Sequence, residues 1–256
     1  MQQTKRLVKQ EWKVYFEAVM LEIRNGFFKE AEESVKASLV IHNATGRLWA
    51  TLIQLQHARS KTSVDFEETY RTFIKSLNEI PKSGEVWCEG ARLHMNSNPC
   101  NQYYDLDMAR KYLEFAIQFT PQYGDSFLEM LKLTMILPQS HESEDLHAQT
   151  RQYCIHAEPN YGVLWFYFKN SILDNAVDVW RNAEEELTRE LPQSKHQVNL
   201  RKSVHSSSNL AGEQWMASQR LIRILRSGMR EECRDLEEHM KIVYGFEQIL
   251  PSASTN

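Results

Sequence analysis

Apolar residues along this chain are spaced so that they fall on one face of an α-helix. Ala91 and Leu93 continue an apolar stripe after Trp87, and Leu131 and Leu133 continue another after Phe127. The chain contains only 9 Gly and 7 Pro, too few for a sandwich or barrel of many short strands joined by turns. The pattern therefore predicts an all-α protein.

A short motif, Gly-x-x-aromatic, recurs at nearly constant spacing and divides the helices into repeats. Its four clearest copies begin at positions 46, 84, 124 and 162, so they step by 38, 40 and 38 residues. A comparable helical segment precedes each glycine, and in three copies a proline stands three residues before it. Tandem repeats of this length are typical of solenoids built from helical hairpins.

The proline and the glycine of the motif predict a tight turn between hairpins. Proline ends the preceding helix because it lacks the N–H group and its ring clashes with the previous turn. Glycine then accepts the backbone angles of the turn without steric cost. We predict repeat turns at Gly46, Pro81, Gly84, Pro121, Gly124, Pro159, Gly162 and Gly212.

The aromatic residue falls in the first turn of the next helix, where it can wedge between neighbouring hairpins. A ladder of rings for a stacked ligand is the alternative, but the fixed distance from the turn favours a structural role. The predicted repeat-core aromatics are Trp12, Trp49, Trp87, Phe127, Trp165 and Trp215. Asp65, Asp105 and Asp174 precede second helices, and their carboxylates can cap the free N–H groups there.

The repeats predict one continuous domain, a right-handed α-solenoid of about five to six hairpins. Residues 1–192 form the array, with a first hairpin that carries Trp12 and turns at Gly26. Residues 193–211 are polar and serine-rich, and we expect an exposed, disordered loop there. The motif resumes at Gly212 and Trp215, so residues 212–256 are predicted to be a hairpin that continues or caps the array.

Several segments resemble the half-a-TPR, or HAT, repeat. Trp12 and Tyr15 stand early in a first helix, and Ala109-Arg110 with Tyr112 and Leu113 follow the pattern of a second helix. The segments 81–93 and 154–165 are most similar to the carboxy-terminal HAT array of the pre-mRNA processing factor that bridges particles in the spliceosomal tri-snRNP. The likeness covers roughly residues 30–192, with Phe127 in place of the usual Trp and a looser match after residue 212.

Composition and charge narrow the class of protein further. The net charge of −4 gives no overall basic field for nucleic acid. The four cysteines, Cys88, Cys100, Cys154 and Cys233, form no C-x-x-C pair and suit a reducing compartment. The amino terminus lacks the pattern of a signal peptide, and no apolar run is long enough to span a membrane. We expect an intracellular protein without a membrane partner.

The clearest surface feature is a basic stripe on the helix predicted after Trp215. At 100° per residue, Arg220, Arg223, Arg226 and Arg230 share about a third of its circumference, which makes them candidate contacts for phosphates or an acidic partner. The alternative is an ordinary solvated helix face. Serines 203 and 206–208 follow basic residues, so phosphorylation could switch a docking site in that loop. The alternative is a flexible insertion that carries no modification.

The sequence offers no catalytic, cofactor-binding or metal-binding pattern. His141 and His147 lie near acidic residues but without the spacing of a tetrahedral site. Phosphate-binding glycine loops, H-E-x-x-H and G-x-S-x-G motifs are absent, and no small-molecule substrate or cofactor is expected.

The expected function is therefore a non-enzymatic scaffold whose grooves receive a peptide or helix from other subunits of a complex. The HAT resemblance implies a pre-mRNA splicing or RNA-processing complex in the nucleus. Two alternatives stay open: a similar scaffold in a cytoskeletal or ciliary assembly, and direct RNA binding through the basic carboxy-terminal helix.

Overall fold

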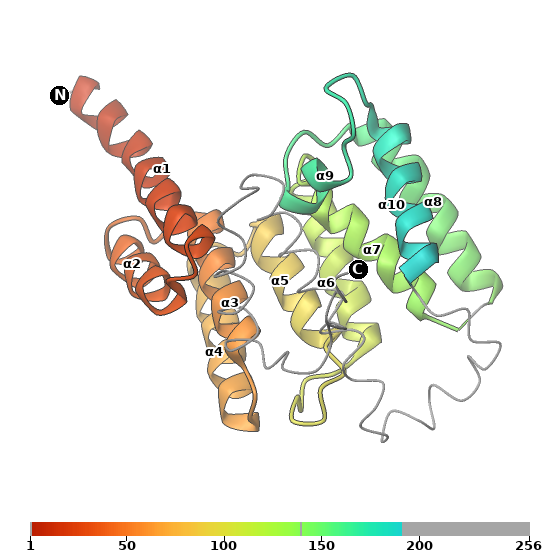
Figure 1. Ribbon diagram of the computed structural model, residues 1–256, viewed down its shortest axis with the longest axis horizontal. Helices are drawn as coiled ribbons and strands as arrows, with labels where there is room; N and C mark the ends of the chain where they lie inside the picture. The colour runs from red at the N-terminus through yellow and green to blue at the C-terminus, as the bar shows by residue number, and fades with distance from the viewer. Residues whose placement is uncertain (1, 139, 191–256) are drawn as a thin grey trace, which may run out of the picture.

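The fold is a row of helical hairpins. The computed structural model describes residues 2–138 and 140–190. These residues form ten α-helices and no extended strand (Figure 1). The helices are α1 (Gln2–Arg24), α2 (Phe28–Ile41), α3 (Gly46–Arg59), α4 (Ser63–Glu79), α5 (Gly84–His94), α6 (Leu106–Phe119), α7 (Gly124–Ile136), α8 (His141–Ala157), α9 (Val163–Tyr167) and α10 (Ala176–Glu190).

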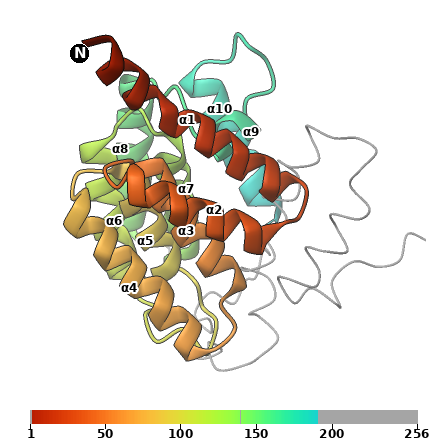
Figure 2. The same ribbon diagram turned by 90° about the vertical axis from the view of Figure 1, so that its left-hand side faces the viewer.

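The first eight helices pair in succession into four hairpins that stack in chain order, and α10 packs against α7 and α8 of the last hairpin. The first helices of neighbouring hairpins pack together, α3 on α5, α5 on α7 and α7 on α9. Figure 2 shows the second helices α4, α6 and α8 in one outer row beside them. The predicted all-α, TPR-like solenoid is confirmed. The predicted loop 193–211 and hairpin 212–256 lie outside the described residues.

The repeat spacing holds at the level of single hydrogen bonds. At the end of each second helix, the N–H of the capping residue donates to the carbonyl oxygen four residues earlier. The four acceptors, Ser38, Ser76, Ala116 and Cys154, are buried and step by the same 38, 40 and 38 residues as the glycines. Three of these helices, α4, α6 and α8, end two residues before Pro81, Pro121 and Pro159.

The predicted helix caps are right at one of three positions. Asp105 caps α6, because its carboxylate accepts from the N–H groups of Asp107 and Met108. Asp65 is not the cap of α4: Thr62 is, and Asp65 completes a capping box from the third position of the helix. Asp174 does not cap α10 either, since the side chain of Asn175 accepts from the first N–H groups of that helix.

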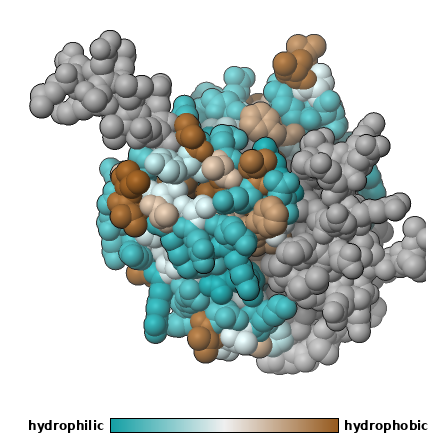
Figure 3. Space-filling view, turned by 60° about the vertical axis from the view of Figure 1, so that its left-hand side comes forward, coloured by the Kyte–Doolittle hydropathy of each residue, from teal (hydrophilic) through white to brown (hydrophobic). Residues whose placement is uncertain are grey.

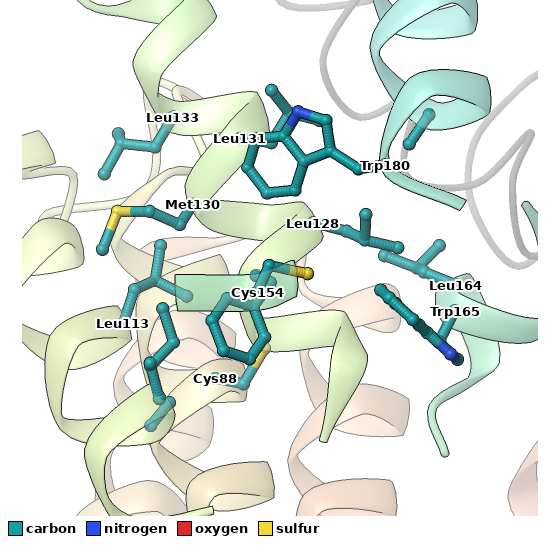
Figure 4. Packing of buried hydrophobic residues seen from close by; sticks show 14 of the residues in the cluster. Cys88, Leu113, Leu128, Met130, Leu131, Leu133, Cys154, Leu164, Trp165 and Trp180 are labelled. Atoms are coloured by element: carbon teal, nitrogen blue, oxygen red, sulfur yellow. The ribbon is translucent and has the colours of Figure 1, made fainter. Parts of the chain in front are cut away.

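Two apolar clusters form the core, one around α1–α5 and one around α5–α10. Trp87 and Tyr112 pack against both and so join them. Figure 4 shows the second cluster, where the leucines of α7 meet Trp165 from α9 and Trp180 from α10. Trp180 is fully buried, although the sequence motif did not single it out.

Candidate interaction surfaces

The motif aromatics lie at the joints between hairpins, but not all are equally buried. Trp49, Phe127 and Trp165 are buried, whereas Trp12 and Trp87 are half-buried and pack against the core from its edge. Trp215 lies outside the described residues. The indole N–H of Trp49 donates to the Asn43 carbonyl oxygen at 2.6 Å, and that of Trp87 donates to Pro81 at 2.8 Å. Each ring therefore also closes the turn that precedes its helix.

The glycines at the repeat turns are needed mainly because neighbouring helices approach closely. A Cβ atom on Gly84 would lie 2.6 Å from the Ala116 carbonyl oxygen, and one on Gly124 would meet the Trp165 ring. Neither has a positive φ; of the four motif glycines only Gly162 does, at +140°. The predicted reason, backbone freedom in the turn, is therefore wrong for three of the four glycines, and close packing replaces it.

Tyr161, just before Gly162, ties together hairpins that are not adjacent. Its hydroxyl donates to the Glu85 carboxylate at 2.9 Å, and the Arg47 guanidinium lies 4.4 Å from its ring centre. The ring also packs against Tyr123 at 5.3 Å. Main-chain bonds join the same loop to the turn before α7, including Gly124 N–H to Tyr161 O at 2.8 Å. One tyrosine thus contacts the starts of α3, α5 and α7.

A charged cluster lies between α5 and α7. The Arg92 guanidinium bonds Glu89 on its own helix, Glu129 at 2.9 Å and Asp125 at 3.4 Å. Asp125 also accepts from the N–H groups of Val163 and Trp165 and so fixes the start of α9. Lys132 lies 3.9 Å from Glu129. All these side chains are largely withdrawn from solvent.

Burial shifts the acid–base properties of this cluster. Loss of hydration raises the pKa of Glu89 to about 7, against the opposing effect of Arg92, and it also raises the pKa of Asp125. On the neighbouring helix α3, burial lowers the pKa of His57 to about 4, and the positive charges of Arg92 and Lys132 add to this. His57 bonds the amide of Asn96 at 2.8 Å. The cluster links α5 to α7 and, through Asp125, to the start of α9.

Sequence reasoning missed this cluster, although a signal exists. Glu89-x-x-Arg92 and Glu129-x-x-Lys132 repeat at the 40-residue step of the motif. On an isolated helix such pairs look like ordinary surface ion pairs. Only their equivalent positions in successive repeats indicate that both pairs face the first helix of a neighbouring hairpin.

Apolar side chains also reach the outer surface. Figure 3 shows small, separate hydrophobic areas on a largely hydrophilic face. One aromatic cluster is defined by ring contacts: Trp87 lies 5.1 Å from Phe115, and Phe115 stacks on Phe119 at 6.1 Å. Phe115 is 40% exposed and Phe119 36%. We call Trp87, Phe115 and Phe119 the outer aromatic cluster.

The other predicted sites are placed as follows. Arg220, Arg223, Arg226 and Arg230, and the serines of the loop, lie outside the described residues. His141 lies 3.8 Å from Glu144, and His147 lies 3.1 Å from Glu184. Within residues 2–138 and 140–190, no three His, Cys, Asp or Glu side chains gather to hold a metal ion. In the same part of the chain, no helix is long and apolar enough to cross a bilayer.

Comparison with known proteins agrees with this architecture. The family model described as PRP6, TPR-like domain matches residues 1–184. A TPR-containing protein of Dictyostelium discoideum is 39% identical over 241 residues, which are 94% of this chain but only 17% of that relative. The chain spans less than a fifth of the relative's length. Since the family model covers well over half of the sequence, the chain belongs to the PRP6 TPR-like domain family.

Proposed function

We propose that this protein is a non-enzymatic scaffold that holds other proteins together in a pre-mRNA splicing complex in the nucleus. The family match over residues 1–184 carries the proposal, since TPR-like arrays use their stacked hairpins as extended binding surfaces. The HAT resemblance points the same way.

The arrangement of the hairpins supports a rigid binding surface. Arg92 links α5 to α7, Asp125 links α7 to α9, and Tyr161 reaches back to α3 and α5. Such contacts hold the hairpins at fixed angles before any partner arrives. A preorganised surface loses less conformational entropy on binding than a flexible one.

The test is affinity purification of the tagged protein from native nuclear extract, followed by protein identification and probing for the small nuclear RNAs of the tri-snRNP. The expected result is enrichment of tri-snRNP proteins and RNAs at moderate salt. A partner set of tubulin-associated proteins would instead support the cytoskeletal or ciliary scaffold.

A second arm separates protein contacts from RNA contacts. Extract treated with ribonuclease should still yield the direct protein partners if grooves on the solenoid hold them. If all partners disappear, or if binding falls steeply as salt rises, phosphate contacts dominate and direct RNA binding is the better account.

A further inference from the structure

The outer aromatic cluster is more apolar than the repeat requires. By the steps of 40 and 38 residues, Lys75 and Tyr153 occupy the position of Phe115 in the neighbouring hairpins, and Glu79 and Ala157 occupy that of Phe119. The fold therefore accepts a lysine and a glutamate where α6 carries two half-exposed phenylalanines. Exposed apolar side chains that lie side by side and are bordered by polar groups are typical of interaction sites.

The cluster is contiguous and partly fixed. Trp87 is held by its bond to the Pro81 carbonyl oxygen and by Tyr112, whose ring lies 5.1 Å away. Its free edge faces Phe115, which stacks on Phe119 with the two ring planes 16° apart. Three rings thus form one surface along the outer side of α6, and an incoming apolar side chain would meet them with little rearrangement.

Two exposed lysines border the cluster. Lys111 precedes Phe115 by one helical turn and so lies on the same side of α6, and Lys82 directly follows Pro81. Neither forms an ion pair with another residue of the described ranges. Glu114, next to Phe115 in sequence, pairs with Arg110 at 3.0 Å and not with Lys111. Lys82 and Lys111 therefore keep unpaired positive charges beside the rings, and an acidic ligand would complement these two lysines.

We propose that Trp87, Phe115 and Phe119, with Lys82 and Lys111, form a docking site for a short acidic segment of a partner protein that carries a bulky apolar side chain. The proposal rests on the proposed function as a protein scaffold and adds the chemistry of one partner. Two lysines on a chain of net charge −4 are too few to hold a nucleic-acid backbone, so a peptide fits better than RNA.

The test is selection of a random peptide library, displayed on phage, against the full chain. Enriched clones should combine Asp or Glu with Trp, Phe, Leu or Ile. They should lose about tenfold or more in affinity on the Phe115→Lys/Phe119→Glu variant, as expected when a central apolar anchor is removed. The preceding hairpin carries Lys and Glu at the equivalent positions, so the variant should fold. Circular dichroism and the urea midpoint check that it does. If the double variant does not fold, Phe119→Ala replaces it in the binding test.

The charge-reversal variant Lys82→Glu/Lys111→Glu should bind the same peptides with lower affinity, and the loss should be larger at low salt than at high salt. The matched control, Lys29→Glu/Lys61→Glu, makes the same change at two other exposed lysines and should leave binding unaltered. The proposal is overturned if no enriched clone depends on the cluster, if the dependent clones are basic, or if fluorescein-labelled oligouridine binds through these residues. If the peptide test fails but tri-snRNP components still co-purify, only the docking site is wrong. If acidic peptides bind the cluster but no tri-snRNP component co-purifies, only the splicing role is wrong.

Discussion

The indole nitrogen of Trp87 donates a hydrogen bond to the carbonyl oxygen of Pro81, 2.8 Å away. Trp49 makes the same bond to Asn43, again six residues earlier. The motif aromatic therefore serves two purposes, since it fills the joint between hairpins and closes the turn in front of its own helix. These two roles can be separated by substitution.

Replacing Trp87 by Phe keeps a ring but removes the bond to Pro81. We expect a loss of about 1 kcal/mol in the free energy of unfolding, the usual net worth of a neutral hydrogen bond. Trp49→Ala should cost about 3–5 kcal/mol, because this ring is buried, and Trp87→Ala should cost less than Trp49→Ala because Trp87 is half-buried. Urea unfolding followed by circular dichroism measures all three. Equal midpoints for wild type and Trp87→Ala, with a partner lost, would show that the ring binds a ligand instead.

Gly84→Ala should destabilise the stack although its φ is not positive. The added Cβ would lie 2.6 Å from the Ala116 carbonyl oxygen and from Thr120, so α5 must move away from α6. Overpacking of this kind typically costs about 1–3 kcal/mol. The matched control is Lys82→Ala, two residues earlier and exposed, which should leave the urea midpoint near that of the wild type. A Gly84→Ala protein with the wild-type urea midpoint would show that the close approach of α6 does not require glycine at this position.

Tyr161 should couple hairpins beyond its immediate neighbours. In an ideal solenoid each repeat contacts only the next, so substitutions in α3 and before α9 would add independently. Because the Arg47 guanidinium lies 4.4 Å from the Tyr161 ring, we expect Arg47→Met and Tyr161→Leu to show a coupling free energy of about 0.5–1 kcal/mol. A double-mutant cycle by urea unfolding provides this value. Strict additivity would show that the contact has no energetic effect.

The repeat architecture could be predicted from the sequence because its determinants are local. Proline ends a helix, glycine permits close approach and a ring three residues later fills the joint, and each effect depends on a few adjacent residues. Even so, the role of Gly84 was predicted for the wrong reason, since the limiting contact is with Ala116, 32 residues away.

The contacts between hairpins could not be predicted in the same way. Glu89 and Arg92 look like a surface ion pair until the neighbouring helix α7 is placed against them, and Tyr161 gives no sign that its partners are Glu85 and Arg47. Whether a charged side chain is buried depends on the angle between neighbouring hairpins, and the sequence of one repeat does not determine that angle. The motif also predicted a buried Trp87. The ring is only half-buried, because on one side it is covered by Phe115, a side chain that is itself partly exposed.

The pH dependence of stability should reveal the buried carboxylate of Glu89. Its pKa rises from an ordinary 4.5 to about 7 in the folded state, so the folded protein binds more protons than the unfolded chain between these values. The contribution of Glu89 to stability is therefore complete below about pH 4.5 and is lost as pH rises through 7. At 1.36 kcal/mol per unit, the whole effect amounts to about 3 kcal/mol. Glu89→Gln, which cannot ionise, should lack it.

The informative quantity is the difference in unfolding free energy between Glu89→Gln and the wild type, measured at several pH values from 4 to 8. His57 acts in the opposite direction, because its lowered pKa of about 4 makes the protein lose stability as pH falls below 6.5. Asp125, with a raised pKa, acts in the same direction as Glu89. His57 is present in both proteins and cancels in the difference, whereas Asp125 shares Arg92 with Glu89, so the difference reports these two coupled carboxylates together. The difference should therefore change in favour of Glu89→Gln as pH rises from 4.5 to 7, and a constant difference would show that Glu89 stays ionised beside Arg92.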